Sequence, residues 1–290
     1  MPFEKILVPV DGSQSSTQGV VIASAMAQAM ESDITLVNVT SSSGPTGMES
    51  GSARDFATTP DYGSISIQVE GDEETSEKEV DSQREHGAEN IVLSARSLVP
   101  MDDDRVRTDV MRYREPPDGI LEMVDQGLYD LVVMGNGGDE RWESSGVGKV
   151  AMKVARDSPV SVMVVKKGAG LSRITALFYQ EDDDLLQLAV EISRAFKSRL
   201  NVLAIEGSEE GCGDVFIANA LKKITDSGIN STSTVVQDED AEVLAGIESA
   251  KTELLLIGKA KVGVLGWITR RNEWLYQLLK DCPCSVLMTP

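Results

Sequence analysis

The sequence predicts an α/β protein built from two tandem copies of one unit, each a parallel sheet with helices on both faces. Residues 5–10 and 34–39 are apolar runs joined by a helical stretch, the pattern of a strand–helix–strand unit in a buried parallel sheet. Residues 131–165 contain a strand, a glycine-rich loop, a helix and a further strand. The same succession returns after residue 170, which indicates an internal duplication.

Composition excludes several classes of protein. The chain has 290 residues, 41% of them hydrophobic, and carries a formal net charge of −20. Such an acidic balance disfavours nucleic acid and anionic membranes as partners, because both are recognised by basic surfaces. Three cysteines give no disulfide framework, no secretory signal pattern is visible, and no apolar run reaches about 18 residues. We therefore expect a cytoplasmic protein that does not span a membrane.

In the first half, the apolar run at 5–10 ends at Asp11 and a glycine turn, and serines follow that can cap a helix reaching Met30. The second strand is expected at 34–39, followed by a loop at 40–62 that is rich in serine and glycine. The later first-half elements are a helix at 73–98, a strand at 105–114, a helix from 116 to 124, a strand at 130–134, a helix ending at 156 and a strand at 160–165.

The polar, glycine-containing residues 166–170 predict the boundary between two domains, one over residues 1–168 and the other over residues 169–290. The second half repeats the pattern more weakly. Its expected strands are 173–179, 200–205, 230–236, 254–257 and 285–288, and its expected helices are 185–196, 215–224, 241–250 and 272–280. The fifth strands of both halves are apolar edges suited to pair with each other.

Three glycines surround the turn from the fourth strand of the first half into the next helix: Gly135, Gly138 and Gly148. Glycine lets a backbone approach a bulky anion closely, and a helix that begins near Gly148 directs unpaired N–H groups toward that anion. The pattern therefore favours a phosphate-bearing ligand. A tightly packed loop without a ligand is the alternative interpretation of the same glycines.

The first half resembles a universal stress protein domain, and the whole chain resembles a tandem of two such domains. Three segments carry the resemblance: ILVPVDGS at 6–13, the spacing G-x2-G-x9-G that ends at Gly148, and KVARDSPVSVMVV at 153–165. The resemblance implies two Rossmann-like domains of the adenine nucleotide alpha hydrolase-like kind, each with five parallel strands. Ligands of such sheets bind at the carboxyl ends of the strands, where the strand order reverses.

The resemblance also implies a ligand, ATP or else AMP or ADP, in the first domain only. Pro9 and Asp11 would border the adenine and ribose, and Val39 would hydrogen-bond the adenine through its backbone. Met134 would contact the nucleoside. The residues that would line the phosphates are Gly135, Gly138, Gly148, Lys149 and Val150.

Lys149 departs from the family pattern, which has serine or threonine after the last glycine. The substitution removes a hydroxyl that binds phosphate or a metal ion, and it adds a positive charge. Two interpretations follow: Lys149 contacts a phosphate directly, or its long side chain obstructs the loop. A Mg²⁺ ion that accompanies the phosphates would lose one ligand in either case.

The second half lacks the motif residues. Tyr179 stands where the first half has an aspartate, residues 259–261 lack the second glycine, and Asn272 and Glu273 replace the final glycine and hydroxyl. A carboxylate facing a phosphate is unfavourable. We therefore expect a degenerate, structural second domain that pairs with the first.

Several weaker signals have simpler explanations. Gly148-Lys149 is not a Walker A motif, because Glu143 and Val150 occupy the positions of a required glycine and hydroxyl. His86, the only histidine, is expected to lie on the surface or to serve in packing, and a single histidine excludes a multi-histidine metal site. The remaining signals predict buried cysteines and solvated or helix-capping aspartates: Cys282, Cys284, residues 102–104 and residues 182–184.

Together these observations predict a regulatory, stress-response protein in which nucleotide occupancy alters a surface for an unidentified protein partner. No nucleophile with a positioned base is visible, so we expect at most slow ATP hydrolysis. One alternative is a nucleotide-independent scaffold with both sites degenerate. Another is an enzyme of the related adenylate-forming or flavin-binding folds. Beyond pairing of the two domains within one chain, a homodimer is a further form of assembly.

Overall fold

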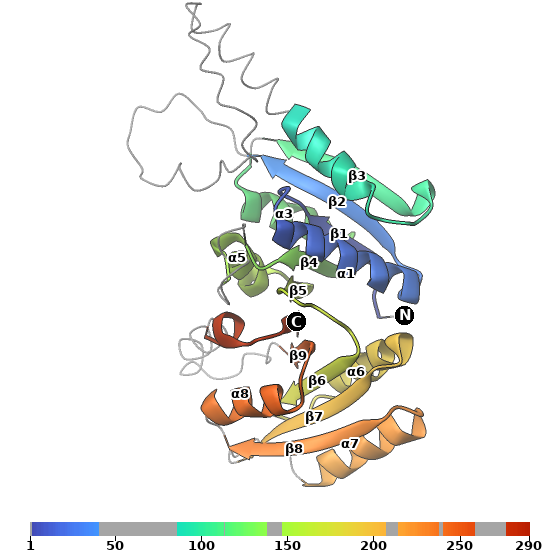
Figure 1. Cartoon of the computed structure of the whole chain (residues 1–290), viewed down its shortest axis with the longest axis vertical. Helices are drawn as coiled ribbons and strands as arrows, with labels where there is room; N and C mark the ends of the chain where they lie inside the picture. Colours follow the sequence, from blue (N-terminus) through green and yellow to red (C-terminus); the bar gives the residue numbers. More distant parts are fainter. Residues whose placement is uncertain are drawn as a thin grey trace, which may run out of the picture.

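The computed structural model describes residues 2–40, 86–112, 114–137, 147–206, 214–237, 240–258 and 277–290. The strands in this part of the chain form one ten-stranded sheet in the order β3-β2-β1-β4-β5-β10-β9-β6-β7-β8. Helices cover both of its faces, as Figure 1 shows. Two layers of buried, mostly aliphatic side chains fill the space between the sheet and the helices.

The first half contributes five parallel strands. They are β1 (Lys5–Pro9), β2 (Asp33–Thr40), β3 (Val106–Arg112), β4 (Leu131–Gly135) and β5 (Ser161–Val165). Its helices are α1 (Gln14–Met30), α3 (Pro116–Asp125) and α5 (Lys149–Asp157), the short 3-10 turn η1 (Asp103–Arg105) and helical residues 86–96. Because β1 lies between β2 and β4, the strand order reverses between β1 and β4.

The second half repeats this arrangement. Its strands are β6 (Arg173–Phe178), β7 (Arg199–Glu206), β8 (Ser231–Gln237), β9 (Leu254–Gly258) and β10 (Ser285–Thr289). Its helices are α6 (Asp183–Phe196), α7 (Asp214–Asp226), α8 (Asp240–Ser249) and helical residues 277–281. The expected loop from residue 41 to 62, the start of the expected helix at 73–98 and most of the one at 272–280 lie outside the described residues.

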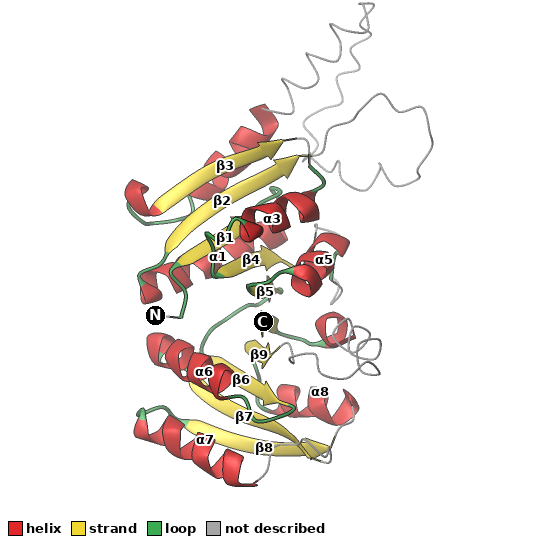
Figure 2. Cartoon of the chain, turned by 180° about the vertical axis from the view of Figure 1, so that it is seen from behind, coloured by secondary structure: helices red, strands yellow, loops and turns green. Residues whose placement is uncertain are grey.

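β5 and β10 join the two halves as the one antiparallel pair among the described strands. Val286 lies opposite Val164, Leu287 opposite Met163, and Met288 opposite Val162. Met163 and Leu287 are each the third residue of their strand and lie opposite each other. The second residue of each strand lies opposite the fourth residue of the other, so the pairing is symmetrical about Met163 and Leu287. The pairing of the two fifth strands that the sequence predicts is therefore present, and Figure 2 shows the halves on either side of it.

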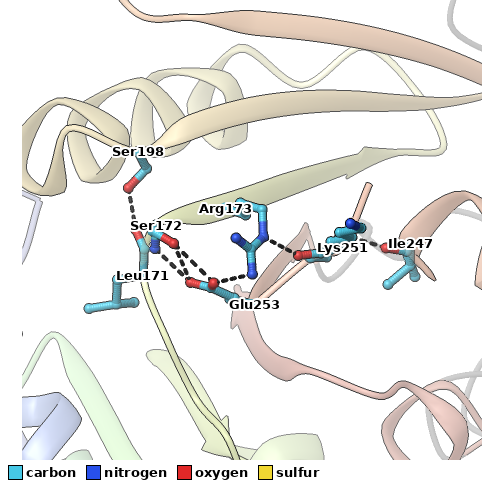
Figure 3. Close-up of polar contacts among 8 residues, drawn as sticks. Leu171, Ser172, Arg173, Ser198, Ile247, Lys251 and Glu253 are labelled. Carbon is cyan, nitrogen blue, oxygen red and sulfur yellow. Dashed lines mark hydrogen bonds and ion pairs between the residues drawn. The ribbon is translucent and has the colours of Figure 1, made fainter. Parts of the chain in front are cut away.

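A carboxylate before the fourth strand anchors the start of the first strand in each half. Asp130 accepts hydrogen bonds from the backbone N–H groups of Glu4 at 2.8 Å and Lys5 at 3.0 Å. Glu253 accepts from the N–H of Ser172 at 2.8 Å and also binds its hydroxyl. Figure 3 shows Glu253 between Ser172 and the guanidinium of Arg173, which lies 2.5 Å away.

The turn into the second strand is also duplicated. α1 and α6 both end at a residue in the left-handed region, Glu31 with φ 56° and Lys197 with φ 53°. The next residue in each half is a buried serine, and the hydroxyls of Ser32 and Ser198 donate to a carbonyl just before the first strand. These matched contacts establish the duplication at the level of individual residues.

Candidate functional site

The carboxyl ends of β1 and β4 lie where the strand order reverses, and the turn after β1 is fixed by short polar contacts. The Asp11 carboxylate accepts the N–H of Ser13 at 2.9 Å. Ser13 in turn caps α1, because its hydroxyl accepts the N–H of Ser16 at 3.2 Å. Asp11 is exposed and held at the rim of this edge of the sheet.

β1 and β2 separate at this edge. Their pairing ends with Pro9 opposite Val37, and a last bond runs from the N–H of Val10 to the Val37 carbonyl at 2.8 Å. In a continued parallel ladder the Val10 carbonyl would accept the N–H of Val39. Instead it accepts the side-chain amide of Asn38 at 2.6 Å.

This separation leaves the backbone of Val39 available on one side. Backbone groups of alternate residues in a strand face the same neighbour, so Val39 faces the β1 side as Val37 does. Within the described residues, no hydrogen bond from β1 or the turn after it reaches Val39. A donor and an acceptor therefore lie side by side beyond the end of β1.

The side chain of Val39 is covered by α3. Gly119 lies so close that a Cβ there would stand 2.6 Å from Cγ1 of Val39 and 2.8 Å from Sδ of Met111. Met134, at the end of β4, is 5% exposed and belongs to the same apolar layer. Together these residues form an apolar wall next to the free backbone of Val39.

Gly135 ends β4 against the first turn of α1. A Cβ at Gly135 would lie 2.5 Å from the carbonyl carbon of Ser15 and 2.6 Å from its oxygen. The Ser15 hydroxyl donates to the carbonyl of Gly137 and lies 3.1 Å from the hydroxyl of Ser13. The loops that follow β1 and β4 are thus tied together, and this contact alone requires a glycine at 135.

α5 begins at Lys149 with a glycine as its N-cap. The N–H of Gly148 donates to the carbonyl of Asn136 at 2.5 Å, and a Cβ on Gly148 would lie 3.1 Å from Cα of Gly137. Within the described residues no side chain caps this helix, and the N–H groups of a first helical turn suit an anion. Lys149 is exposed and Val150 is half-buried at the same helix start.

The structure brings most of the sequence-predicted site residues to this one edge. They are Pro9, Asp11, Val39, Met134, Gly135, Gly148, Lys149 and Val150, whereas Gly138 lies outside the described residues. Sequence reasoning missed Asn38, Ser15 and Gly119. Asn38 alone carried a signal, because it is a polar residue inside an otherwise apolar strand.

The matching edge of the second half is closed. β6 stays paired with β7 one step further, with Phe178 opposite Ala204. Asp182 caps α6 by accepting the N–H of Leu185 at 2.8 Å. Its Oδ2 lies 2.9 Å from the position of a Cβ on Gly258, so a carboxylate stands at the end of β9. Asn272 and Glu273 lie outside the described residues.

The weaker signals have the expected structural explanations. The side chain of His86 is 75% exposed, Asp182 is a helix cap, and Cys282 and Cys284 are buried. No group of three or more potential metal ligands occurs within the described residues. Among the described helices, none has the length and apolar character needed to cross a membrane.

Comparison with known proteins shows which family and which solved structures the chain is similar to. A family model described as the universal stress protein family matches residues 2–166. A universal stress protein from Archaeoglobus fulgidus DSM 4304 aligns over 100% of this chain and 96% of its own, with a TM-score of 0.67 and 15% identity. A functionally unknown protein from Pseudomonas aeruginosa PAO1 aligns over 99% and 92%, with a TM-score of 0.60 and 14% identity. At such identities the likeness concerns the fold. No curated relative matches the chain.

Proposed function

The chain belongs to the universal stress protein family, and on that premise we propose that its first half binds ATP, or AMP or ADP, at the carboxyl ends of β1, β2 and β4. In this proposal residues 1–168 form the nucleotide domain and residues 169–290 form a degenerate domain that pairs with it. Nucleotide occupancy then alters the surface around the glycine loop and regulates an unidentified protein partner. The backbone of Val39, to which no described residue of β1 or the turn after it is bonded, is the observation that carries the proposal.

Adenine suits the edge that Val39 presents. Adenine carries an acceptor, N1, next to a donor, the N6 amino group, and so complements a backbone N–H next to a C=O. Guanine has a donor at N1 and an acceptor at O6, which reverses the pattern. Met134 and Pro9 would flank the base and sugar with apolar surface, and Asp11 would accept a ribose hydroxyl.

The phosphates would lie against the loop that leads into α5. Gly135, Gly138 and Gly148 would suit close approach of a phosphate, and the N–H groups of Lys149 and Val150, which no described side chain caps, would favour an anion. The Lys149 ammonium adds a positive charge where the family has a hydroxyl. We expect Mg²⁺ to contribute less to affinity here for that reason. We assign no catalytic residue.

Thermal unfolding with and without nucleotide tests the proposal. Millimolar ATP should raise the unfolding midpoint, because a ligand at 100 times its Kd stabilises the folded state by about 2.7 kcal/mol. Adenosine should give a smaller rise, and GTP at the same concentration should give none. An unchanged midpoint with all three compounds would contradict nucleotide binding.

A nucleotide-independent scaffold is the second candidate, and one observation favours it. Gly135 and Gly148 both approach neighbouring backbone so closely that packing alone explains them. On that interpretation both sites are degenerate, and substitutions at this edge change stability without changing any affinity for ATP.

A further inference from the structure

Two cysteines and a buried lysine meet at the junction of the two halves. We propose that Cys282 and Cys284 form a redox modification site in which a peroxide oxidises the two thiols to an intramolecular disulfide, with Lys166 as the positioning residue. This site is independent of the proposed nucleotide site. It is built from the turn before β10 and from the residue that follows β5.

The two thiols are already close together. Their Sγ atoms are 3.2 Å apart, and both cysteines are buried in the same apolar layer. Pro283 between them disfavours helical backbone at Cys282, where the helical residues 277–281 have just ended. The two sulfur atoms would have to approach by about 1.1 Å more to reach the S–S bond length of about 2.05 Å.

Lys166 places a cation beside this pair. The residue is only 4% exposed, and its Nζ donates to the carbonyls of Cys282 at 2.5 Å and Lys280 at 3.4 Å. Its N–H also donates to the hydroxyl of Ser285 at 3.1 Å. Lysine near a thiol favours the thiolate, which is the form that attacks a peroxide.

The charges distinguish the two thiols. The hydrogen bond from Cys284 is the largest influence that lowers the pKa of Cys282, and the Lys166 ammonium acts in the same direction. The same contact and burial raise the pKa of Cys284. Burial lowers the pKa of Lys166, and the nearby thiols and Asp281 oppose that shift. We assign Cys282 as the attacking thiol and Cys284 as the thiol that closes the disulfide, because Nζ of Lys166 bonds the carbonyl of Cys282.

The first half contains the same turn without any of these groups. Ser158 occupies the position of Cys282, since its N–H donates to Val154 at 3.0 Å as that of Cys282 donates to Leu278 at 2.8 Å. There the Ser158 hydroxyl simply bonds the backbone of Val160. The fold of the turn thus requires neither thiols nor a buried lysine, so their presence in one half calls for another explanation.

The chemistry balances with peroxide as the oxidant. The Cys282 thiolate attacks one peroxide oxygen, the O–O bond breaks, and the sulfenic acid forms as water leaves. The Cys284 thiol then attacks the Cys282 sulfur, the S–S bond forms, and the sulfenic oxygen leaves as a second water. Two thiols and one hydrogen peroxide give one disulfide and two waters. A metal is less suited, because no third ligand joins the pair in the described part of the chain.

Peroxide titration of the full chain tests the site. A Cys212→Ser background removes the third cysteine of the sequence. The reduced protein is treated with hydrogen peroxide, alkylated in denaturant and cleaved after Lys280, and the peptide 281–290 is weighed. We expect this peptide to lose two hydrogens and to resist alkylation until it is reduced. Met288 in the same peptide reports how far oxidant has reached this part of the chain.

Variants separate the role of the lysine from that of the turn. Lys166→Met should slow disulfide formation about tenfold, whereas Lys167→Met, the adjacent control, should leave the rate unchanged. A double change of Cys282→Ser and Cys284→Val recreates the first-half turn and should fold without reacting. Free thiols after Met288 has oxidised, or separate sulfinic acids, would overturn the proposal. An unchanged rate of disulfide formation in Lys166→Met would overturn the role of the lysine. If that variant misfolds, disulfide formation in the wild-type chain still tests the site itself.

Discussion

The two halves differ at the carboxyl ends of their strands and agree at the amino ends. In the first half β1 leaves β2 after Pro9, and Gly135 ends β4 beside the Ser15 backbone. In the second half β6 stays paired to Phe178, and Gly258 ends β9 beside the Asp182 carboxylate. Among the described residues, the first edge lacks the last strand pair, and its counterpart keeps that pair and carries a carboxylate.

The amino ends, by contrast, retain the same contacts in both halves. Asp130 and Glu253 each bind the start of the first strand, and Ser32 and Ser198 each close the turn into the second. These contacts hold the sheet together and touch no candidate ligand. The comparison indicates that one end of the strands preserves the fold while the other is free to gain or lose a site.

The largest effect should come from adding a methyl group at the end of β4. In Gly135→Ala the new Cβ would stand 2.5 Å from the backbone of Ser15, so α1 must shift. We expect the free energy of unfolding to fall by about 2–3 kcal/mol. Urea denaturation followed by circular dichroism measures this change.

Gly258→Ala is the matched control in the other half. The nearest atom to its Cβ would be Oδ2 of Asp182, at 2.9 Å, and a side-chain end gives way more readily than backbone. The expected loss is under about 1 kcal/mol. Equal losses in the two variants would show that the ends of β4 and β9 are equally crowded. That result would contradict the difference between a backbone neighbour at Gly135 and a side-chain neighbour at Gly258.

Exchanging one residue between the halves tests the open edge itself. Asn38 and Ala204 occupy the same position in β2 and β7. In Asn38→Ala the Val10 carbonyl loses its partner and becomes free to bind the N–H of Val39, which closes the edge. We expect ATP affinity to fall about tenfold to a hundredfold, corresponding to about 1.4–2.7 kcal/mol, in calorimetric titration.

The reciprocal change, Ala204→Asn, should not create a second site, because the Asp182 carboxylate remains in place. Circular dichroism should confirm that both variants fold. Wild-type affinity in Asn38→Ala would refute the role given to the free backbone of Val39.

Sequence reasoning predicted the fold well because the signals are periodic and local. The apolar strands and the proline and serine helix starts follow from patterns within about ten residues, and the duplication follows from the return of those patterns in the second half. The carboxyl-end placement of Pro9, Met134 and Gly148 follows from strand order, which the family resemblance supplied.

The rest depended on contacts between distant residues. Asp130 gives no sequence signal for its bond to Glu4, because the partners are 126 residues apart. Lys166 lies in the polar stretch that predicts the domain boundary, and nothing in that stretch indicates that its side chain is buried against Cys282. The sequence predicts Asp182 as a solvated or helix-capping residue, but its proximity to Gly258 depends on the placement of β9 beside α6.

The anchors at the amino ends should contribute about equally. Glu253→Gln and Asp130→Asn each replace a carboxylate that accepts backbone N–H groups, and we expect each to cost about 1 kcal/mol of unfolding free energy at pH 7. Urea midpoints measure both. A loss confined to one half would show that the two anchors are not equivalent.

Acidification should reduce the effect of Glu253→Gln. Burial raises the pKa of Glu253, but the hydrogen bonds from Ser172 and the charge of Arg173 outweigh it, so its pKa in the folded state is lowered. The carboxylate therefore contributes its full stability above its ordinary pKa of 4.5 and loses it as the pH falls through the lowered folded value. The wild type and Glu253→Gln should differ at pH 7 and converge at strongly acid pH. A constant difference would mean that the charge of Glu253 is irrelevant.

The smallest effect should come from Lys149, where the first half departs from its own family. Lys149→Ser restores a hydroxyl but removes an exposed charge from the start of α5, so ATP affinity should fall about twofold to fivefold while adenosine affinity stays constant. Lys153→Ser removes the same charge one turn later, where the lysine pairs with Asp118, and serves as the control. A rise in ATP affinity would mean that the lysine obstructs the loop. An unchanged ATP affinity would mean that the loop does not hold the phosphates. The two halves would then differ in the shape of their strand ends, but neither would bind phosphate there.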